Sequence, residues 1–201
     1  MCLARTDRLA SGIVALCEVN RMANTNLAKL SKPWPDFLKE IDSALSRPVN
    51  LHCIGGFVLM ACYGIPRSTG DIDYIGVIPR EAADEVVSVG GPDSAVARKY
   101  RLFLQGVGIA DVPDDYESRL QELDLDLRNL KLWILEPYDP LLSKLPRNGP
   151  KDREDAKHLI QKLRLEFATF HDRWQHEMAP WIANKDRHEL TMQLWREYFP
   201  K

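Results

Sequence analysis

The stretch that decides the fold is Ile54-Gly-Gly-Phe-Val-Leu-Met-Ala-Cys-Tyr-Gly-Ile-Pro-Arg-Ser-Thr-Gly-Asp-Ile-Asp73. It begins as a short buried strand ends, because the apolar run from Val49 to Ile54 predicts a strand. After the glycine pair, the apolar run from Phe57 to Tyr63 predicts a helix. A turn at Thr69-Gly70 then leads into a second strand, which we expect over residues 71–78. The predicted order is strand, glycine pair, helix, turn and strand.

Two acidic residues stand two positions apart on the second of these strands. Asp71 and Asp73 therefore project from one face, and carboxylates on one face repel each other unless a cation lies between them. A divalent metal, Mg²⁺ or Mn²⁺, meets that need. Gly55 and Gly56 stand where a strand passes into a helix, where free N–H groups are offered to a phosphate. The alternative, with Asp71 in a turn and Asp73 in solvent, does not explain the apolar residues around them.

Outward from this stretch, strands alternate with helices up to Pro137, and only helices follow. We expect further helices over residues 9–19, 35–47, 80–89, 94–104 and 114–120, and after Pro137 over 138–145, 151–177 and 186–198. We expect further strands over residues 105–112, 123–127 and 130–135, the last two as a hairpin. This order predicts an α/β (α+β) fold with a mixed sheet flanked by helices and a helical C-terminal extension. The expected division is an N-terminal segment (1–34), a core (35–136) and a helical C-terminal region (137–201).

Composition excludes several classes of protein. The 201-residue chain carries a formal net charge of -2, so it lacks the overall basic surplus of a free-standing nucleic-acid binder. It contains no apolar run long enough to cross a membrane, and residues 1–24 are too polar for a secretory signal. The four cysteines show no metal-binding spacing. We therefore expect a cytoplasmic protein with reduced thiols and no membrane partner, and Met22 is an alternative start.

The glycine pair followed by Arg67-Ser-Thr-Gly-Asp-Ile-Asp73 resembles the signature of the polymerase-β-like nucleotidyltransferase superfamily. It is similar in particular to small bacterial nucleotidyltransferase-like proteins related to abortive-infection and toxin–antitoxin toxins. A second segment agrees, Pro140-Leu-Leu-Ser-Lys-Leu-Pro-Arg147 followed by Lys151-Asp-Arg-Glu-Asp155. In that group a helical lysine, then a basic residue and an Asp-x-x-Asp, recur. The resemblance covers residues 49–162 and makes residues 35–136 a nucleotidyltransferase-like core.

The resemblance implies a role for each matching residue. Contacts to the phosphates of a nucleoside triphosphate fall to Gly55, Gly56, Arg67, Ser68 and Thr69. Asp71 and Asp73 would bind magnesium, Lys144 would neutralise phosphate charge, and Asp152 or Asp155 would position that lysine or the acceptor. Many members have Gly-Ser where this chain has Gly-Gly, so Ser68 or Thr69 would replace the serine contact. A surface position for Arg67 and a solvated Lys144 are the alternative interpretations.

A third carboxylate on a neighbouring strand normally completes such a site. Asp111, expected at the end of the strand over residues 105–112, is our candidate for a metal ligand or general base. Asp124 and Asp126 are rivals, because they too stand two apart on an expected strand. Their alternative interpretation is the solvent face of a hairpin.

Two functions follow from these expectations. The first is metal-dependent transfer of a nucleotidyl group to an acceptor hydroxyl, on an RNA 3′ end such as that of a transfer RNA, on a protein, or on a small molecule. Toxin-like members would also have an antitoxin partner. The second is a catalytically degenerate module that binds a nucleotide or a partner. An exposed tryptophan face on the C-terminal helices would favour the second function.

Overall fold

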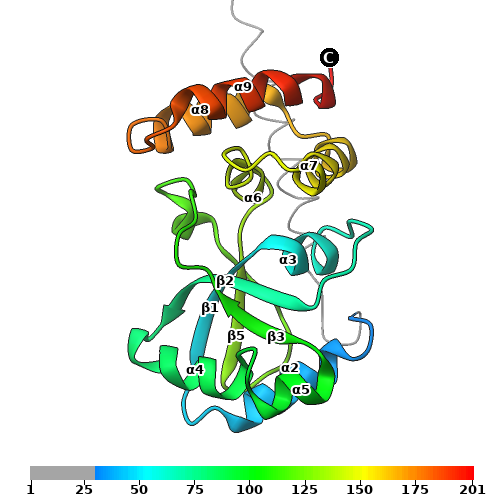
Figure 1. Ribbon diagram of the computed structural model, residues 1–201, viewed down its shortest axis with the longest axis vertical. Coiled ribbons are helices and arrows are strands. Elements are labelled where there is room, and N and C mark those ends of the chain that lie inside the picture. The colour runs from blue at the N-terminus through cyan, green and yellow to red at the C-terminus, as the bar shows by residue number, and fades with distance from the viewer. Residues whose placement is uncertain (1–29) are drawn as a thin grey trace, which may run out of the picture.

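A five-stranded mixed sheet lies at the centre of the computed structural model, which describes residues 30–201 (Figure 1). The strands are β1 (Val49–Ile54), β2 (Asp71–Ile78), β3 (Phe103–Gly106), β4 (Gln121–Glu122) and β5 (Leu130–Ile134). Their order across the sheet is β3-β2-β1-β5-β4. β1 is antiparallel to β2 and parallel to β5, whereas β2 is parallel to β3 and β4 is antiparallel to β5. The expected fold class is confirmed.

Helices flank the sheet and then form the C-terminal region. Those of the core are α2 (Trp34–Ala44), α3 (Gly55–Ala61), α4 (Ala83–Gly90) and α5 (Ala95–Tyr100), with the short 3₁₀ helices η2 (Arg80–Ala82) and η3 (Tyr116–Arg119). Those of the C-terminal region are α6 (Tyr138–Leu142), α7 (Pro150–Leu163), α8 (Phe167–Glu177), α9 (Lys185–Trp195) and η4 (Arg196–Tyr198). Figure 1 shows α2, α4 and α5 at one end of the molecule and α8 and α9 at the other.

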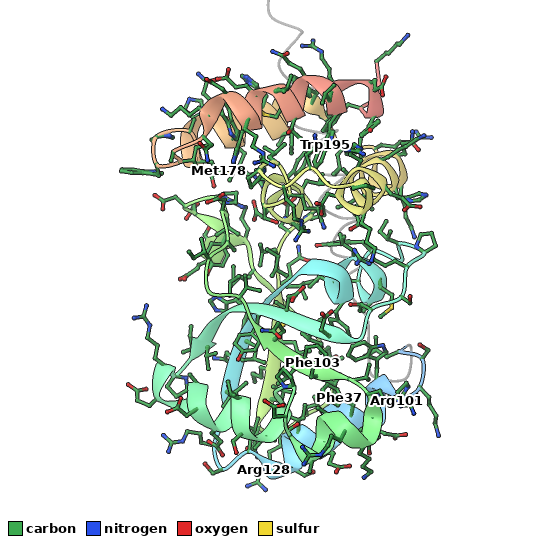
Figure 2. All side chains as sticks on the ribbon, viewed as in Figure 1. Phe37, Arg101, Phe103, Arg128, Met178 and Trp195 are labelled. Carbon is green, nitrogen blue, oxygen red and sulfur yellow. The ribbon has the colours of Figure 1, made fainter. Side chains whose placement is uncertain are left out.

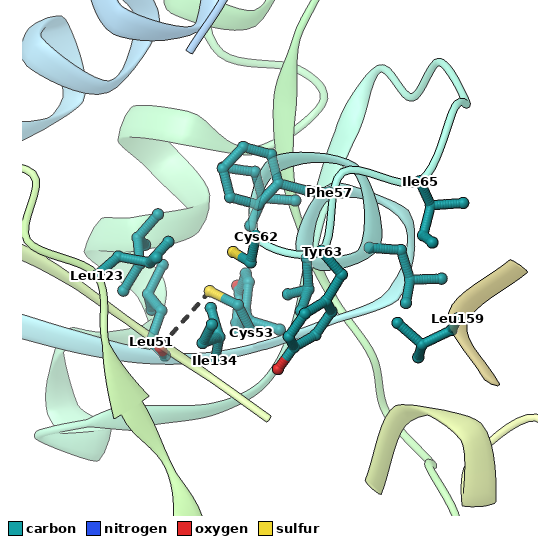
Figure 3. Close-up of a cluster of buried hydrophobic side chains, with 14 of the residues drawn as sticks. Leu51, Cys53, Phe57, Cys62, Tyr63, Ile65, Leu123, Ile134 and Leu159 are labelled. Atoms are coloured by element: carbon teal, nitrogen blue, oxygen red, sulfur yellow. Dashed lines mark hydrogen bonds between the residues drawn. The ribbon is translucent and has the colours of Figure 1, made fainter. Parts of the chain in front are cut away.

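One hydrophobic core joins the sheet to the C-terminal helices. Leu51 of β1, Tyr63 after α3 and Leu159 of α7 belong to the same buried cluster (Figure 3). The Tyr63 hydroxyl donates a hydrogen bond of 2.7 Å to the carbonyl oxygen of Leu135, which satisfies its one polar atom inside that core. Cys53 and Cys62 lie in the same cluster as free thiols. These two cysteines are therefore reduced, as the sequence predicted.

The strand expected over residues 105–112 is wrong in its bounds. The helix before it ends at Tyr100 because Arg101 adopts a left-handed conformation (φ 56), and β3 begins at Phe103. β3 ends at Gly106, and the amide of Val107 makes one last bond of 2.8 Å to the carbonyl oxygen of Tyr74. Residues 107–113 then leave the sheet as a loop.

The hairpin expected over residues 123–135 is confirmed in its second strand, β5, and in its antiparallel pairing, but wrong in the bounds of its first strand. β5 pairs with β4 instead, and no strand forms over residues 123–127 because Asp126 adopts a left-handed conformation (φ 50). Asp42 of α2 accepts hydrogen bonds from the amides of Asn129 and Leu130, at 2.5 and 2.8 Å. The turn is therefore fixed by a helix rather than by a facing strand.

Two further expectations need correction, and one lies outside the described residues. The long helix over residues 151–177 is two helices, because Arg164 is left-handed (φ 51) and ends α7. The helix over residues 114–120 is the 3₁₀ turn η3. The helix expected over residues 9–19 and the alternative start at Met22 fall outside residues 30–201. Among the described helices, none is long and apolar enough to cross a membrane.

Candidate active site

The turn between β1 and α3 brings the glycine pair against the second acidic residue. Gly55 has a left-handed backbone (φ +78), and a Cβ atom there would overlap Oδ2 of Asp73. A Cβ atom on Gly56 would lie 3.0 Å from Cζ of Arg67. The two glycines therefore leave room for a carboxylate and a guanidinium group at the start of α3.

Gly55→Ala should disrupt this turn without touching the rest of the sheet. An alanine would strain the left-handed backbone and displace Asp73, so we expect a loss of stability of about 1–3 kcal/mol. Magnesium-dependent binding of a nucleoside triphosphate should fall with it. Gly108→Ala is the matched control, because nothing lies within 4 Å of a Cβ atom there. Thermal denaturation and calorimetric titration measure both effects; equal behaviour of the two variants would contradict the argument.

The paired aspartates lie half-buried at the beginning of β2, as expected. Oγ1 of Thr69 donates a hydrogen bond of 2.5 Å to Oδ1 of Asp71. Burial raises the pKa of Asp73, the neighbouring charge of Asp71 raises it further, and nearby Arg147 and Lys144 oppose the shift. Asp73, which is poorly solvated and stands next to a like charge that raises its pKa, is stabilised by a bound cation.

A cluster of cations and carboxylates from the C-terminal region lies beside Asp73, in which Lys144 and the two aspartates are buried and Arg147 is exposed. Nζ of Lys144 is 3.1 Å from Oδ1 of Asp152 and 3.1 Å from Oδ2 of Asp155. Lys144 is only 4% exposed, so the interpretation as a solvated lysine is wrong. Arg147 binds Asp152 through Nε at 2.7 Å and Nη2 at 2.5 Å. Nη1 of Arg67 lies 2.5 Å from Oδ2 of Asp155, which links the core to α7.

Asp152 is ionised in this cluster at neutral pH. Burial would raise its pKa, but the hydrogen bonds from Arg147, the charge of Lys144 and the amide of Gly149 outweigh that effect and lower the pKa to about 2. The amide of Gly149 donates to Oδ2 at 3.0 Å. The carboxylate thus holds both cations in place at the start of α7.

The third carboxylate is not where we expected it. In the parallel pairing of β2 with β3, the residue opposite Asp73 is Gln105, so an amide stands in the neighbouring position on the same face. Asp111 lies in the loop after β3 rather than at a strand end, where its charge opposes the lowering of the pKa of His188 by burial. Asp124 and Asp126 are exposed and lie outside any strand.

The residues present nevertheless fit one magnesium ion. Within residues 30–201 no group of three or more His, Cys, Asp or Glu side chains could hold a metal. Magnesium, however, is commonly held by one or two carboxylates while substrate phosphates and water complete its shell. Asp71 and Asp73 supply that donor set.

Sequence reasoning missed Arg147 and Gln105 as members of this site. A signal for Arg147 existed, because the resemblance includes a basic residue between the lysine and the Asp-x-x-Asp pair, and Arg147 stands at that place. No signal for Gln105 existed, since its position depends on strand register. Ser68 lines a pocket of about 240 Å³ together with Arg67, Asp155 and His158.

The sheet, the glycine turn and the paired carboxylates define a domain of the nucleotidyltransferase type. The model of a family described as "Nucleotidyltransferase of unknown function (DUF6036)" matches residues 36–201, and the chain belongs to that family. Comparisons with curated proteins and with solved structures found no match.

Proposed function

We propose that the protein transfers a nucleotidyl group from a nucleoside triphosphate to an acceptor hydroxyl, on an RNA 3′ end or a protein. The observation that supports this most is the meeting of Asp71 and Asp73 with Lys144, Arg147 and Arg67 at one glycine turn. Carboxylates alone would repel a triphosphate, and cations alone would not hold a metal. Their combination suits a metal-bound triphosphate.

Each group then has a defined task. Asp71 and Asp73 hold a magnesium or manganese ion, which neutralises charge on the phosphates. Arg67, which lies against Gly56, and Lys144, whose charge acts on Asp73, would bind the β- and γ-phosphates. Asp155 contacts both cations and positions them. An acceptor hydroxyl oxygen attacks the α-phosphorus, the bond to the β-phosphoryl oxygen breaks, pyrophosphate leaves, and the hydroxyl proton passes to solvent.

A calorimetric titration tests the proposal. The protein is titrated with each of the four nucleoside triphosphates, with and without MgCl₂. We expect magnesium-dependent binding that the double variant Asp71→Asn/Asp73→Asn loses. The matched control is Asp124→Asn/Asp126→Asn, which alters two exposed acids at the same spacing and should bind as the wild type does. Binding that survives in the first variant would refute the proposed metal site.

A catalytically degenerate module is the second candidate, and the amide of Gln105 in place of a third acid favours it. Such a module would bind the triphosphate without turnover. A tryptophan face for a protein partner receives less support, because Trp174 and Trp195 are buried and Trp181 alone of the three is exposed. A toxin role with an antitoxin partner rests on the resemblance.

A further inference from the structure

A pocket of about 550 Å³ lies on the sheet beside the candidate active site. Its lining includes His52, Gly76, Ile78, Arg80, Tyr116 and Glu117. His52 stands two residues before Ile54 on β1, and Ile54 is the partner of Asp73. Residues two apart on a strand share a face and lie about 7 Å apart. The pocket therefore opens on the face that carries the paired aspartates.

Two aromatic rings form one wall of this pocket. The rings of His52 and Tyr116 meet edge to face, 5.9 Å between centroids, and the Tyr116 hydroxyl lies 3.2 Å from Nδ1 of His52. The same hydroxyl donates to Oε1 of Glu117 at 3.3 Å. A Cβ atom on Gly76 would lie 3.0 Å from Nδ1 of His52, so the glycine makes room for the imidazole.

The surrounding contacts fix this wall in place and leave one cation without a partner. Arg119, which ends η3, binds buried Asp139 at 3.2 Å and Glu177 at 2.6 Å. Burial lowers the pKa of His52, so its ring is neutral at pH 7. Arg80 makes no ion pair with any residue in the described part of the chain. The pocket thus presents the Tyr116 ring beside the mostly buried His52 ring, one carboxylate, and one guanidinium group that has no ion-pair partner within residues 30–201.

The direction of the strands places this pocket opposite the phosphate-binding groups. Gly55 follows the carboxyl end of β1, and Arg67 lies over Gly56. His52 and Gly76 lie on the other side of Asp73 along the same two strands. In phosphoryl transfer the attacking and leaving oxygens are roughly in line through the phosphorus. A triphosphate whose pyrophosphate points toward Arg67 would be attacked from the side of His52.

We propose that the pocket at His52, Tyr116, Arg80 and Glu117 binds the acceptor, and that the acceptor is a ribonucleotide unit. This inference rests on the proposed nucleotidyl transfer. The base lies against the rings of His52 and Tyr116, the phosphate binds Arg80, and a sugar hydroxyl bonds to Glu117 while the 3′-hydroxyl faces Asp73. That hydroxyl oxygen bonds to the α-phosphorus of the triphosphate, pyrophosphate leaves, and the proton is released to water.

The chemistry of the lining favours a nucleotide over a protein side chain. Bases stack on aromatic rings, and arginine is a preferred ligand of phosphate. Carboxylates accept hydrogen bonds from ribose hydroxyls. A serine or tyrosine side chain would fill only part of the volume and would leave Arg80 without a partner. A free nucleotide and the end of an RNA strand share the recognised chemistry.

Fluorescence anisotropy of a short single-stranded RNA, labelled at its 5′ end, tests the pocket without any triphosphate. We expect Arg80→Gln to weaken binding about tenfold, as loss of one charge-assisted phosphate contact does. The control is Arg128→Gln, an exposed arginine that does not line the pocket (Figure 2), which should bind like the wild type. The same RNA ending in a 3′-phosphate should bind more weakly, and Glu117→Gln should reduce that preference, because the repelling carboxylate is gone.

The outcomes separate this inference from the proposed function. If AMP or CMP competes with an affinity close to that of the RNA, the acceptor is a free nucleotide. If RNA binding resists both nucleotides, the acceptor is the end of an RNA strand. Either result supports the pocket. Wild-type RNA affinity in Arg80→Gln overturns it, as does an unchanged preference for the 3′-hydroxyl end in Glu117→Gln. Transfer of label from an α-³²P triphosphate to a polypeptide such as casein but not to RNA overturns it as well. The separate titration of Asp71→Asn/Asp73→Asn with triphosphates tests the proposed function, and its result does not depend on RNA binding.

Discussion

Trp195→Ala should lower the free energy of unfolding by about 3–5 kcal/mol, the usual cost of replacing a buried tryptophan with alanine. Trp195 is fully buried at the end of α9 (Figure 2), and its Nε1 donates to Oδ1 of Asn148 at 3.1 Å. The substitution leaves a cavity and removes the hydrogen bond. For a chain of this length the midpoint of thermal unfolding should fall by on the order of 10 °C.

The molecule offers a matched control in a second tryptophan. Trp181 is 73% exposed between α8 and α9, so Trp181→Ala should change stability by no more than about 0.5 kcal/mol. Urea and thermal denaturation of both variants measure the difference. Equal stabilities would mean that α9 does not pack on the rest of the protein as described.

Lys144→Met should reduce the rate of nucleotidyl transfer about 100- to 1,000-fold, the effect of removing one donor aimed at developing charge. Methionine keeps the apolar stem but cannot bind phosphate. The fold should persist, because each carboxylate keeps another partner. Asp152 retains Arg147 and the amide of Gly149, and Asp155 retains Arg67. We expect a smaller loss of stability than for Trp195→Ala.

Lys157→Met is the control for that experiment. Lys157 lies on the same helix, α7, but is exposed. The kcat/KM of Lys157→Met for the triphosphate and the melting temperature of this variant should match those of the wild type. If Lys144→Met lost stability but kept its rate per folded molecule, Lys144 would be structural and the phosphate contact would be excluded.

Local sequence pattern was enough to predict the part of the fold around the glycine pair. β1, α3 and β2 lie where apolar periodicity and turn residues place them, because those signals act over a few neighbours. The first strand of the hairpin over residues 123–135 was misplaced because Asp42, distant in sequence, binds the amides of Asn129 and Leu130. The long helix over residues 151–177 failed because Arg164 adopts a left-handed conformation that its residue type rarely favours.

The candidate site was predictable where spacing carried the information. Spacing placed Asp71 and Asp73 on one face, and the resemblance linked Lys144 to Asp152 and Asp155, with which the structure brings it into contact. The neighbour of Asp73 was not predictable, since a shift of one residue in strand register changes which side chain stands there. Asp111 was misplaced for a different reason. The expected strand ran to residue 112, whereas the pairing of β3 with β2 ends near Tyr74.

The link between Arg67 and Asp155 has a consequence for synthesis of the chain on the ribosome. The acidic pair and the glycine turn are made first, and most of the positive charge that balances them is made later, in Lys144 and Arg147. A growing chain therefore carries an acidic site with too few cations to hold a triphosphate. If the proposed function holds, a chain can bind a triphosphate only after α7 has been released from the ribosome and has docked against Arg67.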